Sequence, residues 1–333
     1  MKKHNFYAGP AILPQTVMQK AANAVLDFGD SGLSITEISH RSDVFVKVLQ
    51  KARSLVRELL ALDDDHEVLF LSGGASTQFF TVPYNVLGPE QTAGYVDTGT
   101  WAFKALQEAK LFGKVKVLAS SKEANYTFIP KDYEIPEDLK YMHITSNNTV
   151  YGTQYHSYPE TDVPLVCDMS SDIFCQPIDA NKFGIIYAGA QKNLGPAGTT
   201  LVIVKKSFID EKVRDLPTMV NYHTHIAKGS SFNTPPVFPI FVCMLTLERL
   251  KEYGGIAKIA QENKEKADLL YKEIDDNPFF HGTTAKEDRS LMNVCFLMKD
   301  TERENDFLAL AEEAGCVGLK GHRSVGGFRA SIY

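Results

Sequence analysis

The segment "GIIYAGAQKNLGPAGTTLVIVKK", residues 184–206, places two apolar runs on either side of a turn rich in glycine and alanine. Runs of Ile, Val and Leu without polar alternation are typical of strands that helices cover on both faces. Lys192 lies between the two runs and follows Gln191, and its small neighbours leave room around its amine. The segment therefore predicts part of an α/β sheet with a lysine at the end of a buried strand.

Five more short apolar runs precede this segment and alternate with helical stretches. Such alternation is typical of an α/β domain whose sheet is mostly parallel. The five runs are "EVLFLS" (67–72), "TAGYVDTG" (92–99), "VKVLAS" (115–120), "YMHITS" (141–146) and "PLVCDMS" (164–170).

Two helices are expected before the first of these strands. Apolar spacing predicts a helix over residues 17–28. Ser42 is a candidate N-cap of a longer helix that ends near Leu62. The apolar positions of the first helix are Met18, Ala21, Ala22 and Val25.

Beyond Pro235 long helical stretches replace the short apolar runs. A helical stretch over residues 238–253 is broken at Gly254 and Gly255 and then resumes. Strand-like and helical stretches follow over residues 290–333, which predicts a small α+β domain. We divide the chain into an N-terminal segment (1–15), a large domain (16–255) and a small C-terminal domain (256–333).

Composition limits the classes of function. The chain has 333 residues, of which 44% are hydrophobic and 23% charged, as in ordinary soluble proteins. The formal net charge of −6 disfavours binding to nucleic acid or to an anionic membrane, so an anionic substrate needs a local cluster of cations.

The cysteines and the N-terminus point to a cytoplasmic enzyme. The five cysteines are scattered without CxxC spacing, so neither a disulfide framework nor a metal site is expected. The start "MKKHNFYAGP" lacks the apolar core of an export signal, and no apolar run is long enough to span a bilayer.

Four features follow predicted strands, where open α/β sheets bind ligands. In "LSGGASTQFF" (71–80), two glycines open a helix whose free N–H groups favour an anion such as phosphate, although a simple tight turn explains them equally well. Asp168 is either a cap or a carboxylate that holds a proton on a heterocyclic nitrogen. Trp101, the only tryptophan, packs in the core or stacks on an aromatic cofactor.

Lys192 is the fourth feature. A lysine amine is a nucleophile only when it loses its proton, and a partly desolvated pocket lowers its pKa. Alone, a strand-end lysine is more often a solvated charge. Together, the anion cradle, Trp101, Asp168 and Lys192 follow the order and spacing of a site for pyridoxal phosphate (PLP).

Six segments of the chain resemble the phosphoserine aminotransferases, which are PLP enzymes of aminotransferase class V. The resemblance implies a PLP-dependent transferase of fold type I, with a large domain built on a mostly parallel mixed sheet and a small α+β C-terminal domain. The six segments are "NFYAGPAILP" (5–14), "EISHRS" (37–42), "DMSSDIFCQPID" (168–179), "YAGAQKNLGPAG" (187–198), "SFNTPP" (231–236) and "GHRSVGGFRASIY" (321–333).

The resemblance also implies roles for the cofactor-binding residues. Lys192 would carry PLP covalently and shuttle a proton, and Asp168 would pair with the pyridinium nitrogen. Trp101 would stack on the ring and Thr149 would bind its 3-oxygen. The phosphate would be held by Ala75, Ser76 and Gln191, and by Asn233 and Thr234 of the other subunit of a homodimer with shared active sites.

The implied reaction moves an amino group from L-glutamate to 3-phosphonooxypyruvate, by way of pyridoxamine phosphate, and yields phosphoserine and 2-oxoglutarate. 4-Phosphohydroxy-threonine, in PLP biosynthesis, is a possible further substrate. Arg329 would bind the α-carboxylate. The substrate phosphate would be bound by Arg41, His322 and Arg323, some of them across the dimer, and His40 is a further substrate-binding position.

Two positions depart from the family pattern. Many members carry Arg where this chain has Ser76, which removes one charged substrate contact. Members also usually continue for a short strand and helix beyond the position of Tyr333, so we expect the small domain to lack its last element.

Other functions stay open at this point. They are another class V transaminase such as an alanine–glyoxylate type, a cysteine desulfurase, a non-catalytic binding protein and a nucleotide-binding protein. The lack of a P-loop disfavours nucleotide binding, and Lys192 with Asp168 disfavours binding without catalysis.

Overall fold

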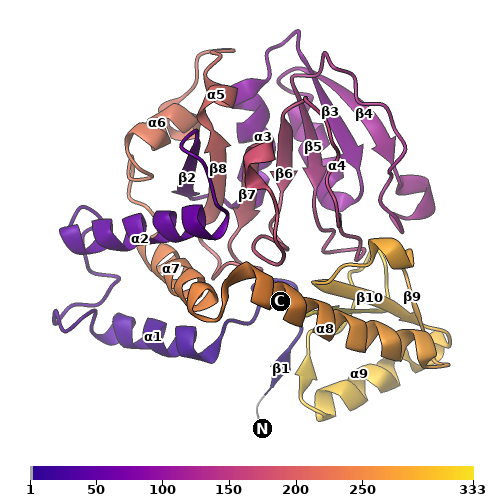
Figure 1. Cartoon of the computed structure of the whole chain (residues 1–333). Coiled ribbons are helices and arrows are strands. Elements are labelled where there is room, and N and C mark those ends of the chain that lie inside the picture. The colour runs from indigo at the N-terminus through magenta and orange to yellow at the C-terminus, as the bar shows by residue number, and fades with distance from the viewer. Residues whose placement is uncertain (1–2) are drawn as a thin grey trace.

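A seven-stranded mixed sheet forms the centre of the computed structural model, which describes residues 3–333 (Figure 1). The strand order is β2-β8-β7-β6-β5-β3-β4. Every neighbouring pair is parallel except the two that contain β8. The strands are β2 (His66–Leu71), β3 (Thr92–Asp97), β4 (Lys114–Ser120), β5 (Tyr141–Thr145), β6 (Leu165–Asp168), β7 (Phe183–Gly189) and β8 (Thr200–Lys205). All seven predicted strands are confirmed.

Strands β7 and β8 form an antiparallel pair, and the loop between them carries Lys192. All of β7 and most of β8 are buried, as their unbroken apolar runs predict. The loop closes on itself, because Ala190 N–H donates to Thr199 O at 3.1 Å and Gly195 N–H to Ala190 O at 2.7 Å. Gly195 contacts helix α7 (Val237–Glu252), since an added Cβ there would lie 2.5 Å from Cys243 Sγ.

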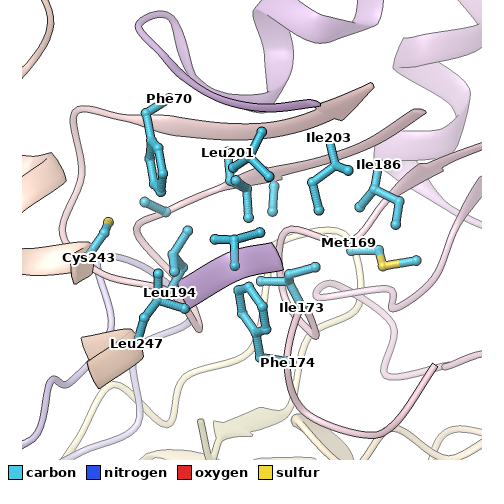
Figure 2. Packing of buried hydrophobic residues seen from close by; sticks show 14 of the residues in the cluster. Phe70, Met169, Ile173, Phe174, Ile186, Leu194, Leu201, Ile203, Cys243 and Leu247 are labelled. Atoms are coloured by element: carbon cyan, nitrogen blue, oxygen red, sulfur yellow. The ribbon is translucent and has the colours of Figure 1, made fainter. Parts of the chain in front are cut away.

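One face of the sheet packs against α1 (Gln15–Leu26), α2 (Asp43–Leu59) and α7 (Val237–Glu252). Figure 2 shows part of this core, in which Phe70, Leu201 and Ile203 of the strands face Leu194 and Ile173. The predicted N-cap is confirmed, since Ser42 Oγ accepts a hydrogen bond from Phe45 N–H at 3.4 Å.

The apolar stripe predicted for α1 is wrong by one residue. Met18 and Val25 are 50% and 41% exposed, and the helix buries Val17, Ala21 and Ala24 instead. The apolar residues of α1 can form either of two stripes along the helix. The stripe that contains Ala21 and Ala24 is the one that packs, and α1 packs against α7. The larger residues of the other stripe therefore remain on the surface.

The opposite face of the sheet is covered by α3 (Gly74–Val86) and α4 (Thr100–Ala109). Shorter elements complete the large domain: α5 (Lys206–Ile209), α6 (Tyr222–Ala227), η1 (Lys122–Ala124), η2 (Ala180–Lys182) and η3 (Thr218–Val220). Apolar layers cover both faces of the sheet and exclude water from them. A ligand can therefore reach polar side chains of the sheet only at the ends of its strands.

The C-terminal part contains a second, antiparallel sheet of order β12-β10-β9. Helix α8 packs on it, and four phenylalanines, Phe280, Phe296, Phe307 and Phe328, form its aromatic core. Its elements are α8 (Gly255–Asp276), β9 (Phe280–Gly282), η4 (Lys286–Asp288), β10 (Asn293–Met298), η5 (Thr301–Arg303), α9 (Glu304–Glu313) and β12 (Phe328–Ser331).

The N-terminal segment joins this C-terminal part. Strand β1 (His4–Asn5) pairs in parallel with β11 (Cys316–Val317). The proposed boundary at residue 255 falls at the first residue of α8 and stays a prediction. Across residues 3–333, every helix is too short or too polar to cross a membrane.

Replacing Ile186 in the middle of β7 tests the central core. Its side chain is 1% exposed, so Ile186→Ala should lower the free energy of unfolding by about 3 kcal/mol, measured by urea denaturation. Leu310→Ala on α9, where the side chain is 64% exposed, is the control and should change it by less than about 0.5 kcal/mol. Equal losses would contradict this account of the core.

Candidate active site

The predicted site residues gather at one edge of the large sheet. Asp168 ends β6, Lys192 follows β7, and Thr149 lies in the segment after β5. Trp101 is in the first turn of α4, directly after β3. Because the carboxyl ends of these parallel strands meet at the same edge, side chains far apart in sequence converge there.

Lys192 is held by contacts from two directions. Its Nζ donates to Thr149 Oγ1 at 2.6 Å and lies 5.7 Å from the centroid of the Trp101 ring. On the other side the N-terminal segment contacts the lysine loop: Ala11 N–H donates to Gln191 O at 2.9 Å. A Cβ on Gly9, whose φ is +155°, would lie 3.2 Å from Lys192 Cγ.

The amine of Lys192 has an altered acidity. Burial lowers the pKa of Lys192 to about 8, Asp168 and Asp172 oppose this shift, and Arg329 adds to it. At pH 7 about a tenth of the amine is therefore neutral, compared with a fraction of about 0.0004 for an ordinary lysine. The fold thus prepares a nucleophile and base.

Asp168 is buried and only partly satisfied by neighbouring groups. One carboxylate oxygen, Oδ1, accepts from Ser170 N–H at 2.9 Å and from Ser170 Oγ at 2.6 Å. Burial raises the pKa of Asp168, while Lys192 and the two hydrogen bonds from Ser170 act in the opposite direction. A cationic or N–H group facing the carboxyl would stabilise its charged form.

Asp172 is a second buried carboxyl that the sequence reasoning missed. Its Oδ1 accepts from Ser146 Oγ, and its Oδ2 accepts from Gln154 Nε2 at 3.2 Å. Burial raises the pKa of Asp172 to about 7. The available signal was its position in the segment that begins at Asp168, four residues further along the chain.

The start of α3 provides a place for an anion. Gly73 and Gly74 have φ values of +106° and +73°, and the helix has no side-chain cap. A Cβ at Gly74 would meet open space, which leaves the amides of Ala75 and Ser76 accessible. Ser76 is exposed and Ala75 is half-buried against the core.

The second phosphate contact that was predicted, Gln191, lies beside the end of β7. Its side chain is half-buried and so close to Gly189 that a Cβ there would meet Gln191 Oε1 at 2.8 Å.

A group of cations from the C-terminal part lies over this edge. Arg329 on β12 donates from Nη1 to Thr149 O at 3.1 Å, and its buried Nε has no partner within the described residues. Burial lowers the pKa of His322, and the positive charges of Arg329, Arg323 and Lys104 lower it further. Lys104, on α4, was missed because nothing in its local sequence distinguishes it from a surface lysine.

Four predicted residues do not join the cluster within this single chain. His40 and Arg41 occupy a surface turn between α1 and α2, where Arg41 is exposed. Asn233 and Thr234 are exposed before α7, although Asn233 lines a hollow with Ser72 and Thr77 near the start of α3.

The arrangement fits a planar, phosphorylated pyridine aldehyde. The buried indole Nε1 of Trp101 has no partner among residues 3–333, and the space at Gly74 adjoins free backbone amides. Asp168 could pair with a ring nitrogen, Lys192 could react with an aldehyde, and the start of α3 could hold a phosphate. These features together are those of a candidate PLP site in a fold type I enzyme.

Comparisons with known proteins agree with this geometry. The family model of class V aminotransferases matches residues 3–333. A phosphoserine aminotransferase of Flavobacterium johnsoniae is 57% identical over 334 residues, covering 100% of this chain and 94% of the relative. The chain belongs to the class V aminotransferases, and its cofactor is pyridoxal phosphate.

Solved structures agree as well. The phosphoserine aminotransferase from Bacillus circulans subsp. alkalophilus matches with a TM-score of 0.97 and 46% identity, covering 100% of this chain and 93% of that one. The PLP-bound phosphoserine aminotransferase from Trichomonas vaginalis matches with a TM-score of 0.95 and 34% identity, covering 100% and 95%. The predicted fold type I is thereby confirmed.

The acidity of Lys192 can be measured in the apoprotein. The rate at which an amine-specific acylating reagent modifies Lys192 should rise with pH and reach half its maximum near pH 8, because burial disfavours the ammonium form. Peptide mass spectrometry after short exposures gives the rate. A midpoint near the ordinary lysine value of about 10.4 would contradict the proposed desolvation.

Proposed function

We propose that this aminotransferase moves the amino group of L-glutamate to 3-phosphonooxypyruvate, giving O-phospho-L-serine and 2-oxoglutarate in two successive half-reactions. The cluster of cations beside Lys192 carries this proposal, because the chain as a whole has a net charge of −6. The relatives named phosphoserine aminotransferase support the same substrates.

PLP, when bound, supplies a ring that withdraws electrons from the substrate Cα. Asp168 would pair with the ring nitrogen and favour its protonated form, and the face of Trp101 would stack on the ring. The hydroxyl of Thr149 binds the 3-oxygen. The amides of Ala75 and Ser76, with the side chain of Gln191, bind the phosphate at the start of α3.

Lys192 has two tasks in this proposal. Its neutral amine would hold the cofactor covalently, and the freed amine would act as the general base and acid that carries a proton between the substrate Cα and the C4′ position. The pKa of about 8 suits both tasks, because the amine gains and loses protons near neutral pH. Burial of the site keeps bulk water from competing for that proton.

Arg329 binds the α-carboxylate. Its Nη1 donates to the Thr149 carbonyl, and its Nε has no partner among residues 3–333. A planar fork of donors fits a carboxylate with two parallel hydrogen bonds. His322 and Arg323 bind the substrate phosphate, as do His40 and Arg41. 4-Phosphohydroxy-threonine offers the same anionic ends and is a candidate second substrate.

The enzyme acts as a homodimer in this proposal, with His40, Arg41, Asn233 and Thr234 supplied by the partner subunit. Arg41 is exposed, and among residues 3–333 it forms no salt bridge with a carboxylate. A twofold dimer would bury that surface and complete two equivalent sites. Exposed apolar side chains of this region are Tyr7, Ile12, Met18, Val25, Leu26, Leu33, Val44 and Val46.

The cysteines argue against a desulfurase and for a reducing compartment. Burial raises the pKa of Cys295 to about 12 and also raises the pKa of Cys167, Cys175 and Cys243, so these thiols remain protonated and poor nucleophiles. All five cysteines are free. We therefore propose that the protein is cytoplasmic.

Half-reactions with phosphorylated and plain serine test the substrate. Purified holoenzyme mixed with O-phospho-L-serine should lose its yellow absorbance at least about 100-fold more efficiently than with L-serine, because only the former engages the cations. Lys192→Ala should bind PLP but not turn over. Equal efficiencies for the two serines, or wild-type turnover by Lys192→Ala, would refute the proposal.

Mixed dimers test the shared active site. Arg41→Ala and Lys192→Ala homodimers should each be nearly inactive, whereas a mixture refolded together should recover up to about a quarter of wild-type activity, since half of the mixed dimers' sites are intact. Mixing without refolding is the control. No recovery would show that Arg41 does not act across the interface.

A further inference from the structure

Lys104 lies one helical turn after Trp101 on α4 and faces the same site. Its Nζ is 4.8 Å from the centroid of the Trp101 ring, while Nζ of Lys192 is 5.7 Å from that centroid. Two ammonium groups therefore contact one indole. The side chain of Lys104 is exposed, so its position is not fixed by burial in the core.

Lys104 adds a positive charge to a group that already lacks counterions. It lies near His322, which also neighbours Arg323 and Arg329. Across residues 3–333, neither Lys104 nor either arginine forms a salt bridge with a carboxylate. Like charges gathered without counterions repel one another, so the group is arranged for a multivalent anion.

The other side of the site offers no comparable charge. The first turn of α3 contains Ala75, Ser76 and Thr77, none of which is cationic. His322, Arg323 and Arg329 all come from the C-terminal part of the chain. Besides Lys192, the large domain thus places a second cation, Lys104, next to Trp101.

We propose that Lys104 binds the phosphate of the substrate and sets the preference of the enzyme for a phosphorylated amino acid over glutamate. This inference rests on the proposed function and names a specificity residue for it. A phosphate carries nearly two negative charges at neutral pH, whereas the γ-carboxylate of glutamate carries one. An added cation therefore stabilises bound phosphoserine more than bound glutamate.

The kinetic test compares three variants of the holoenzyme in the two half-reactions. Lys104→Met should raise KM for O-phosphoserine about tenfold and KM for glutamate less than about twofold, with kcat nearly unchanged. Lys104→Arg should keep the preference. Lys110→Met, at the exposed C-terminal end of the same helix, should behave as wild type and controls for the loss of a surface charge.

A second readout does not depend on turnover. In NMR titrations of the holoenzyme, Lys104→Met should raise the pKa of His322 and weaken the binding of inorganic phosphate about tenfold, since one neighbouring cation is lost. Lys110→Met should change neither quantity. This measurement also shows whether Lys104→Met has kept its fold.

The outcomes separate this inference from the proposed function. If wild-type enzyme uses phosphoserine but Lys104→Met changes both KM values equally, the inference is wrong and the proposed function stands. If wild-type enzyme does not use phosphoserine, the proposed function is wrong and the specificity role of Lys104 falls with it. Unchanged phosphate affinity in Lys104→Met overturns the inference by itself.

Discussion

The removal of Lys192 from water is the constraint on which the site depends. An ammonium group surrounded by protein is costly, so the fold either neutralises it or supplies anionic neighbours, and here it does both in part. The pKa of Lys192 falls to about 8 through burial, while Asp168 and Asp172 limit the fall. If burial lowered the pKa of Lys192 much further, the amine would have no proton to donate. If the carboxylates paired with it more strongly, it would stay protonated and could not act as a nucleophile.

The surroundings of Lys192 are rigid because a buried polar network joins the large sheet to the C-terminal part. Asn147 Nδ2 donates to Asn293 Oδ1 at 2.7 Å and to Ser171 Oγ at 2.8 Å, and Thr149 Oγ1 donates to the same Ser171 Oγ at 3.1 Å. Buried networks of satisfied groups fix a single arrangement better than apolar contacts do. Through Ser171, this network also positions the Thr149 hydroxyl, which accepts the hydrogen bond from Lys192 Nζ.

Local patterns in the sequence predicted the sheet and the principal site residues. The apolar runs around Lys192 and Asp168 were long and uniform enough to predict strands, and strand ends converge by topology. The stripe of α1 was misplaced because its spacing allowed two faces, and only the packing on α7 decides between them. Asp172, Lys104 and Gly9 act through contacts between distant segments, which no local pattern reveals.

The predicted residues that stayed apart have a related explanation. His40 and Arg41 lie in a surface turn of this chain. In the dimer proposed above they would meet Lys192 of a second copy, an arrangement that a pattern in one chain cannot specify.

The contacts of the N-terminal segment have a consequence for the order in which the molecule assembles. Gly9 and Ala11 support the loop of Lys192, but Phe6 O accepts from Ser331 N–H at 3.2 Å and Ala8 O from Tyr333 Oη at 2.9 Å. These contacts span more than three hundred residues, and loops of that length close late. During synthesis on the ribosome, the reactive lysine would therefore remain in an unfinished setting until the last of these residues had emerged, which delays its reactivity until the chain can fold around it.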